Sequence, residues 1–487
     1  MIVSDNISRA RIKSVRIALS YVIPPIILSI LISKAGLLTG IASLFGVFVL
    51  YFLFVVFRNY RAGYLLLTVF GFLMFQFYRL MPEVPYIPLG VGVEIFLALL
   101  FLSLILNSHG DTNDFEFKKD LYRSPITYAM IIYVAYSLLV LLNPSSRAVM
   151  GRVMALREIT ALLVLFFVSI HVFRSHKFVH FYLDCWICFA LVAALYGIYQ
   201  EIFGLQDWEL KWLYAQPDQG KLAIVWGHIR KWSFLSDINS FGLLMSYGGI
   251  VCLILALGPF STIKKIYFAS CSLLMLISMT FSGTRTAMAM VVLGLAFFVV
   301  MTLNQLRSIV LIACFCLVML ALFFGPFYGP NFNRLRSTFD VKEDASMNVR
   351  DQTRARVQPY VRTHAFGGGF YTSGTLGLKY DPGHSLAGKW DPDSGYLRTA
   401  LERGWVGLLV QLGLHITILI TGLNLFFKTT NPVTASITCA YLCGFFALSV
   451  ANYAQDSLEQ KPTNLILMSS FATIINLMAL GKRDETN

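Results

Sequence analysis

Long apolar stretches recur through this 487-residue chain, from residue 17 almost to the C-terminus. Each holds roughly 17 to 25 residues, enough to cross the ~30 Å hydrocarbon layer of a membrane as a helix. A β-barrel is excluded, because its strands would alternate in polarity over about ten residues. With only 13% charged residues, the chain also cannot cover a water-facing surface. The sequence therefore predicts an all-α fold, a polytopic integral membrane helical bundle.

The apolar stretches predict about 14 transmembrane helices, each bounded by polar or turn-forming residues. The expected spans are residues 17–33, 37–57, 62–78, 86–106, 125–142, 155–173, 178–203, 238–258, 264–281, 285–303, 307–327, 403–427, 432–453 and 463–480. The first span follows a basic segment, as in a signal peptide. Because Pro24 and Pro25 interrupt it and no small-residue cleavage site follows, we expect an uncleaved helix.

Basic residues in the short loops predict the orientation. If the N-terminus is cytoplasmic, nearly every inside loop carries Lys or Arg beside a helix end, as the positive-inside rule requires. Both termini are then cytoplasmic, and the two long polar segments lie on the outer face. The chain divides into N-terminal helices (1–150), a helical core with an outer loop at 204–237 (151–327), a large outer loop (328–402) and C-terminal helices (403–487).

More than half of the 39 Lys and Arg residues then lie on the outer face, and many are arginines. Those that stand out are Arg157 near a helix start, Arg285 at the start of a span, and Arg350, Arg354 and Arg356 in an expected short helix of the large loop. A guanidinium fork suits a diphosphate, because two parallel N–H groups match two oxygens. Binding of lipid headgroups or pairing with nearby aspartates is the alternative. Nucleic acid is not expected as a partner on this side of a membrane.

The large loop also carries candidate acid–base residues. His384 stands near Asp381, Asp391 and Asp393, and these side chains suit a general base as well as they suit hydrogen bonding within the loop. Glu402 lies at the membrane boundary, where a carboxylate is costly unless paired. We expect it to have an architectural role that holds the loop against the bundle.

Three runs occur in a characteristic order: WSFLSDINSFGLLMSY (232–247), FSGTRTAMAM (281–290) and DSGYLRTALERGWVGLL (393–409), with an arginine-rich outer loop between the last two. Together they resemble the bacterial O-antigen ligase/polymerase superfamily of integral membrane proteins, over roughly residues 150 to 455. The resemblance implies a fold of the GT-C glycosyltransferase type. It also implies inverting transfer of a glycan from undecaprenyl diphosphate to an acceptor hydroxyl, with no metal, cofactor or nucleotide-sugar.

The resemblance also assigns residues. Arg285 matches the family's arginine after Ser-Gly, and Arg350, Arg354 or Arg356 match the loop arginines that contact the diphosphate. The family's Glu-x-Gly-x-x-Gly motif, which follows the loop arginines, matches Glu402, Gly404 and Gly407. Where many ligases have His-Asn, this chain has Asp393 and Ser394, so that the acceptor base is expected to be Asp393 or His384.

The missing His-Asn pair favours a polymerase of exopolysaccharide or O-antigen repeat units over a ligase that moves finished glycan to a lipid core or protein. A transporter of lipid-linked glycan is a third hypothesis; it would place charges near the bilayer midplane and often shows related halves. The resemblance implies the bacterial inner membrane as location and an undecaprenyl-diphosphate-linked donor, a glycan acceptor and membrane lipids as partners. Chain-length regulators and export proteins are possible partners of a polymerase.

Overall fold

The computed structural model describes residues 54–80, 89–107, 121–215, 223–225, 227–303, 310, 345–389 and 391–484. The expected span at 17–33, and most of those at 37–57 and 307–327, lie outside these residues. The side chains of 345–351, Arg350 among them, also lie outside the description.

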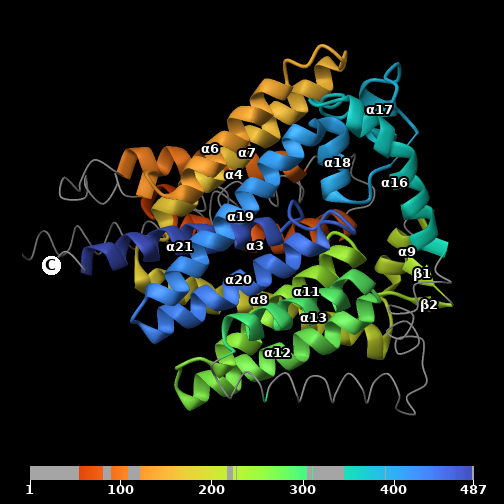
Figure 1. Cartoon of the computed structure of the whole chain (residues 1–487). Helices are drawn as coiled ribbons and strands as arrows, with labels where there is room; N and C mark the ends of the chain where they lie inside the picture. The colour runs from red at the N-terminus through yellow and green to blue at the C-terminus, as the bar shows by residue number, and fades with distance from the viewer. Residues whose placement is uncertain are drawn as a thin grey trace, which may run out of the picture.

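The described chain is mostly helical (Figure 1). The long apolar helices are α3 (Tyr60–Leu80), α4 (Leu89–Asn107), α6 (Pro125–Val140), α7 (Val149–Val172), α8 (His176–Phe203), α11 (Ile238–Leu257), α12 (Thr262–Ser282), α13 (Arg285–Met301), α19 (Gly404–Lys428), α20 (Pro432–Ala451) and α21 (Thr463–Asp484). The polar segments form α9 (Asp207–Ala215), α16 (Ala345–Thr363), α17 (Gly374–Tyr380), α18 (Gly395–Glu402) and the antiparallel pair β1 (Ile224–Val225) and β2 (His228–Ile229).

Eight of these helices are long and apolar enough to cross a membrane: α3, α7, α8, α11, α12, α19, α20 and α21. Three more apolar helices, α4, α6 and α13, are shorter. All eleven coincide within a few residues with spans expected from the sequence. The chain is therefore an all-α integral membrane protein, and the total of about 14 spans remains a prediction.

Three helices form the centre of the bundle. At least 78% of the membrane window of α11, α20 and α21 is buried within the protein. α11 packs against α8, α12, α13 and α20, and α21 packs against α7 and α19. Outer helices expose large apolar side chains instead, such as Ile132 (59% exposed) and Leu139 (65%) on α6. Apolar exposure of this kind fits a lipid surrounding, because lipid tails do not penalise it.

Hydrogen bonds between side chains join the helices inside the bundle. The Tyr64 hydroxyl on α3 lies 2.9 Å from Ser169 Oγ on α7, and Thr68 Oγ1 lies 3.1 Å from the Tyr182 hydroxyl on α8. Asn476 on α21 donates to the Ile170 carbonyl at 3.0 Å. Since lipid tails are as apolar as a leucine core, helix association in a membrane depends on such bonds and on close packing.

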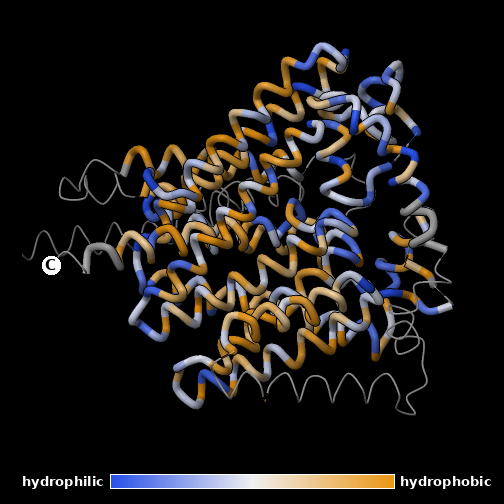
Figure 2. The backbone as a smooth tube through the Cα atoms, in the orientation of Figure 1, coloured by the Kyte–Doolittle hydropathy of each residue, from blue (hydrophilic) through white to orange (hydrophobic). Residues whose placement is uncertain are grey.

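The polar elements gather at one end of the bundle. Figure 1 shows α9, β1, β2, α16, α17 and α18 on the side away from the C-terminus, and Figure 2 shows hydrophilic residues concentrated there. The described parts of the segments 204–237 and 328–402 thus share one end of the molecule, as the sequence predicts. A small apolar cluster of Val357, Leu386 and Leu401 packs these loop helices together.

The junction between α18 and α19 depends on glycine backbone. Gly368 and Gly369 donate their N–H groups to the carbonyls of Leu401 and Glu402, each at 2.8 Å, which satisfies the C-terminal end of α18. Gly404 follows with φ +73°, a conformation that other residues rarely adopt. The chain can therefore turn sharply between Glu402 and the first turn of α19, with Gly404 packed against the backbone of Ala365 and Gly367.

Replacing Gly404 with alanine is expected to destabilise the protein by about 1–3 kcal/mol. The new Cβ would overlap the carbonyl oxygen of Ala365, in addition to the backbone strain at positive φ. Gly413→Ala is the matched control on the same helix, since a Cβ there meets no atom within 4 Å. Thermal unfolding of the detergent-solubilised variants measures the difference. Equal stability of the two variants would contradict the junction described here.

Candidate functional site

A cavity of about 300 Å³ lies where the helical bundle meets the polar end. α4, α6, α7, α19 and α21 contribute its walls, and α18 and the loop between α20 and α21 cover it. The ionisable side chains that line it are Glu94, Arg157, Glu158, Arg398, Glu402, Arg403, His415, Asp456, Glu459 and Lys461. Charges at a membrane boundary are functional candidates by default, because burying them is expensive.

The cavity is polar at one end and apolar at the other. Arg403 lies at the start of α19, whereas Ile418 on the same helix also lines the cavity. The two residues are about 22 Å apart along the helix axis. The apolar end is lined by side chains that include Leu165, Leu467 and Phe471. A molecule with a charged head and a hydrocarbon tail would fit both ends.

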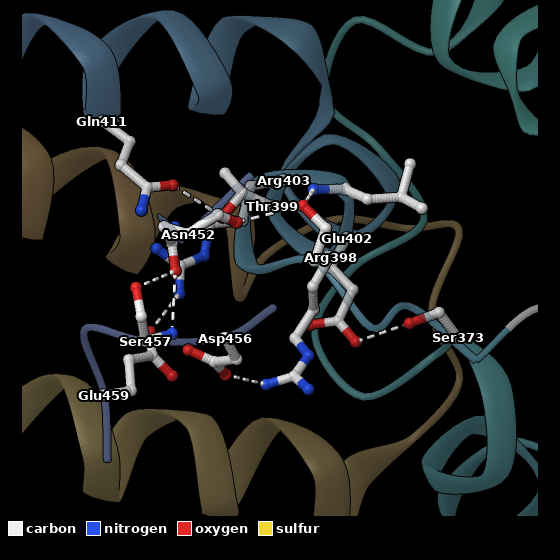
Figure 3. A network of polar contacts seen from close by, with 12 residues as sticks. Ser373, Arg398, Thr399, Glu402, Arg403, Gln411, Asn452, Asp456, Ser457 and Glu459 are labelled. Atoms are coloured by element: carbon white, nitrogen blue, oxygen red, sulfur yellow. Dashed lines mark hydrogen bonds and ion pairs between the residues drawn. The ribbon is translucent and has the colours of Figure 1, made fainter. Parts of the chain in front are cut away.

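The polar end is formed by α18 docking on the α20–α21 loop (Figure 3). Arg398 Nη1 on α18 lies 2.7 Å from Asp456 Oδ2 in that loop. The backbone N–H of Asp456 donates to the Asp393 carbonyl at 2.9 Å, and Ser394 Oγ donates to the Asn452 carbonyl at 3.1 Å. These contacts fix the guanidinium of Arg398 in the cavity wall.

Arg403 is held by aromatic side chains of α6. Its guanidinium donates to the Tyr133 hydroxyl and lies over the Tyr133 and Phe370 rings. The Tyr136 hydroxyl donates to the Arg403 carbonyl at 2.6 Å, and the guanidinium lies 3.9 Å from Glu459. Its side chain is 14% exposed, so that it is preorganised rather than mobile.

A third arginine bridges two helices at the edge of the cavity. Arg157 Nε on α7 lies 3.0 Å from Glu94 Oε1 on α4. The side chains of Arg157 and Glu94 are 35% and 20% exposed, close to the 36% and 20% of Arg398 and Asp456. An exposed ion pair is weak and readily exchanged for another anion.

Glu402 ends α18 inside the cavity wall and is 6% exposed. Its Oε1 accepts a hydrogen bond from Ser373 Oγ at 2.9 Å. Burial raises the pKa of its carboxyl to about 6, and the charges of Arg398 and Arg403 limit the rise. The structure thus places this carboxylate in contact with the cavity, where the sequence suggested an architectural role.

Two further loop groups have shifted pKa values. Burial, together with the charge of Glu459, raises the pKa of Asp456 to about 6. Burial lowers the pKa of Lys461, and the neighbouring carboxylates Glu459, Glu158 and Glu94 oppose the shift. The polar end is therefore a set of mutually paired charges that are partly withdrawn from water.

Of the side chains predicted from the sequence, Arg157 and Glu402 line this cavity. Gly407 packs beside it against Tyr136 and Arg403. Arg354 on α16 contacts the cavity's covering loop, since its Nη2 donates to the Tyr453 carbonyl at 3.0 Å and its guanidinium lies 4.0 Å from the Tyr453 ring centre.

The other predicted residues lie outside the cavity lining. Arg356 is exposed on α16, and Arg285 starts α13 next to Thr284, which accepts a hydrogen bond from Arg230. Asp393 is exposed in the turn before α18. His384 is half-buried; its Nδ1 accepts from the Leu386 N–H at 3.2 Å, and burial lowers its pKa.

Asp381 and Asp391, near His384 in the sequence, bind backbone groups of the polar end. Asp381 Oδ2 accepts from the Arg147 N–H at 2.8 Å, and Asp391 Oδ1 accepts from the N–H and the hydroxyl of Thr375 at 2.6 and 3.0 Å. Within the described residues, no group of three or more His, Cys, Asp or Glu side chains is arranged to hold a metal ion.

Sequence reasoning missed the cavity residues Glu94, Arg398, Asp456, Glu459 and Lys461. The run AQDSLEQKPT (454–463) did carry a signal, because it places three ionisable residues in a short connection between two apolar spans. Arg398 stands in the motif already noted at 393–409. What the sequence does not reveal is that these two segments meet.

Residues 270–412 match the family model described as O-antigen ligase. The match confirms the resemblance to the O-antigen ligase/polymerase superfamily over that part of the chain, which runs from within α12 through α18 into α19. It suggests an activity of the ligase/polymerase type on lipid-linked glycan. A search of curated proteins found no match.

Arg398→Ala is expected to destabilise the protein by about 1–3 kcal/mol, because it leaves the Asp456 carboxylate without its cation in a buried site. Adding Asp456→Asn should recover part of that loss, since the amide carries no charge. Thermal unfolding in detergent measures both, with the exposed Arg362→Ala on α16 as control. If the double variant loses as much stability as Arg398→Ala and Asp456→Asn together, the two residues do not form the pair that docks α18.

Proposed function

On the basis of the O-antigen ligase match and the two-ended cavity, we propose that this protein joins undecaprenyl-diphosphate-linked oligosaccharide repeat units into exopolysaccharide or O-antigen. The observation that carries the proposal is a cavity that has partly buried arginines at one end and apolar side chains at the other, with its lining reaching Ile418, about 22 Å from Arg403 along α19. The donor has matching parts: a diphosphate and a polyprenyl chain.

The diphosphate would lie among Arg157, Arg398 and Arg403. Each of these now faces a carboxylate, so that diphosphate oxygens would take positions that Glu94, Asp456 and Glu459 occupy in part. Breaking the sugar–phosphate bond leaves negative charge on the lipid diphosphate. Guanidinium groups fixed in a site shielded from water stabilise that charge without further reorganisation.

The arginines assigned from the resemblance form a second set. Arg350, Arg354 and Arg356 lie on α16, which contacts the covering loop through Arg354 and Tyr453. Together with Arg285 they remain candidates for the diphosphate. Their contribution can be separated from that of Arg157, which lines the cavity itself.

The reaction proposed is attack of an acceptor hydroxyl on the anomeric carbon of the donor, with inversion and without metal or nucleotide-sugar. The polar end would face the outer side of the bacterial inner membrane, with both termini cytoplasmic. Chain-length regulators and export proteins would act on the growing product.

A ligase that transfers finished glycan to a lipid core or protein is the second candidate, favoured by the description of the matching family. Asp393 and Ser394 in place of the ligase-type His-Asn pair favour the polymerase. A transporter is a weaker candidate, because the paired charges lie at one end of the cavity rather than along its apolar length.

Purified protein reconstituted with labelled undecaprenyl-diphosphate repeat units should produce a ladder of increasing repeat number and release the lipid diphosphate. Gel separation of the labelled glycans provides the readout. Unchanged substrate that is consumed only after a lipid-core or protein acceptor is added would support the ligase. Movement of the substrate across the vesicle membrane without any new linkage would support a transporter.

Arg157→Ala is expected to raise the donor KM by about 10- to 100-fold, since one charge-assisted contact of roughly 1.5–3 kcal/mol is lost. Arg362→Ala is the matched control, because it removes an exposed arginine of α16 outside the cavity. Initial rates at varied donor concentration measure the effect. An unchanged KM in Arg157→Ala together with a loss in Arg285→Ala would move the diphosphate away from this cavity.

A further inference from the structure

We propose that Glu402 is the general base that accepts the proton of the attacking hydroxyl. The inference rests on the proposed function and adds a role for a residue that the sequence had assigned to architecture.

Glu402 lies where acceptor and donor would meet. It is the last residue of α18, so that its backbone belongs to the polar covering layer while its side chain lines the cavity beside Arg398 and Arg403. The backbone N–H of Gly369 binds its carbonyl, and Ser373 binds its carboxylate. Both partners come from the loop segment 367–373, which holds the carboxylate in one orientation.

The neighbouring arginines are engaged elsewhere. Arg398 pairs with Asp456 at 2.7 Å and Arg403 with Glu459 at 3.9 Å, whereas Glu402 takes its hydrogen bond from a neutral hydroxyl. A carboxylate in a tight ion pair is a poor base, since the cation stabilises its charged form. Glu158 on α7 also interacts with a neutral hydroxyl, that of Tyr371, but it is exposed. Glu402, in contrast, is buried and bound to the neutral Ser373.

The surroundings of Glu402 tune its basicity. The charged and titratable groups around it are Arg398 on α18, Arg403 at the start of α19, Tyr371 in the preceding loop, Glu158 on α7, and Asp456 and Glu459 in the α20–α21 loop. Burial raises the pKa of Glu402 to about 6. A general base works best with a pKa near the working pH, and a bound diphosphate dianion would raise the value further.

The step balances as a single displacement. The acceptor oxygen bonds to the anomeric carbon, and the bond from that carbon to the phosphate oxygen breaks. The lipid diphosphate leaves with the electron pair, stabilised by the arginines, and the hydroxyl proton passes to the Glu402 carboxylate. Glu402 then returns the proton to water or to the departing diphosphate.

The two bases proposed from sequence are placed differently. The Nδ1 of His384 accepts the Leu386 N–H, and Asp393 is exposed in the turn before α18. Neither is part of the cavity lining, whereas Glu402 is. The three candidates can therefore be separated by variants at each position.

Glu402→Gln should lower kcat by about 10²- to 10⁴-fold in the reconstituted assay, with little change in the donor KM. In the wild type, kcat should fall tenfold per pH unit below the pKa of Glu402 in the substrate complex, at or above the value of about 6 in the free protein, because protonated Glu402 cannot accept a proton. This acid limb should be absent from the residual activity of Glu402→Gln. Full kcat in Glu402→Gln, with ladder formation intact, would overturn the inference and leave the proposed function standing.

Ser373→Ala tests whether Glu402 acts as a base, because a purely structural role of Glu402 would not shift the pH dependence of kcat. Loss of its hydrogen bond to the charged carboxylate raises the pKa of Glu402, so the acid limb should move to higher pH. The Ser373→Ala variant also tests the proposal if Glu402→Gln does not fold, because Glu402 itself is unchanged in it. An acid limb that stays in place would overturn the proposal.

Controls separate the other carboxyls. Asp456→Asn should keep the acid limb in kcat, because the group proposed to titrate in that limb is Glu402 and Asp456 pairs with Arg398. Asp381→Asn removes another buried loop carboxylate that binds only backbone, and should keep the limb as well. Loss of the limb in Asp393→Asn, His384→Ala or Glu158→Gln, with the limb retained in Glu402→Gln, would assign the base to that residue instead. Failure of the wild type to form product contradicts the proposed function itself.

Discussion

The docking of α18 on the α20–α21 loop is the interaction on which the polar end depends. The pair of Arg398 and Asp456 joins two segments separated by a complete helical hairpin, and the hydrogen bonds from Ser394 and Asp456 extend the contact. Without it Arg398 and Glu402 would not face the arginines of α7 and α19. The cost of withdrawing charges from water is offset by mutual pairing, which also leaves the site ready to exchange carboxylates for another anion.

The sequence predicted the helices well because apolar length alone determines a membrane span. Eleven expected spans, and the helix that contains Arg350 and Arg354, coincide with helices of the structure. The site was predicted only in part. Arg157 and Glu402 could be chosen because a charge beside an apolar run is conspicuous, whereas Arg398 and Asp456 acquire meaning only once α18 and the α20–α21 loop are in contact.

The loop aspartates show the opposite limit of sequence reasoning. Asp381 and Asp391 have the residue type of catalytic groups, yet each binds backbone N–H groups within the polar layer. A catalytic base and an aspartate that only binds loop backbone can have the same residue type and similar sequence neighbours. Burial beside a cavity, and a neutral rather than a cationic partner, distinguish Glu402 from them.

The most direct test of the account is a structure of the protein in a lipid nanodisc with a short-chain polyprenyl diphosphate bound. We expect the diphosphate next to the guanidinium groups of Arg157, Arg398 and Arg403, with the hydrocarbon chain following α19 toward Ile418. A diphosphate bound beside Arg285, with the cavity empty of lipid, would contradict it.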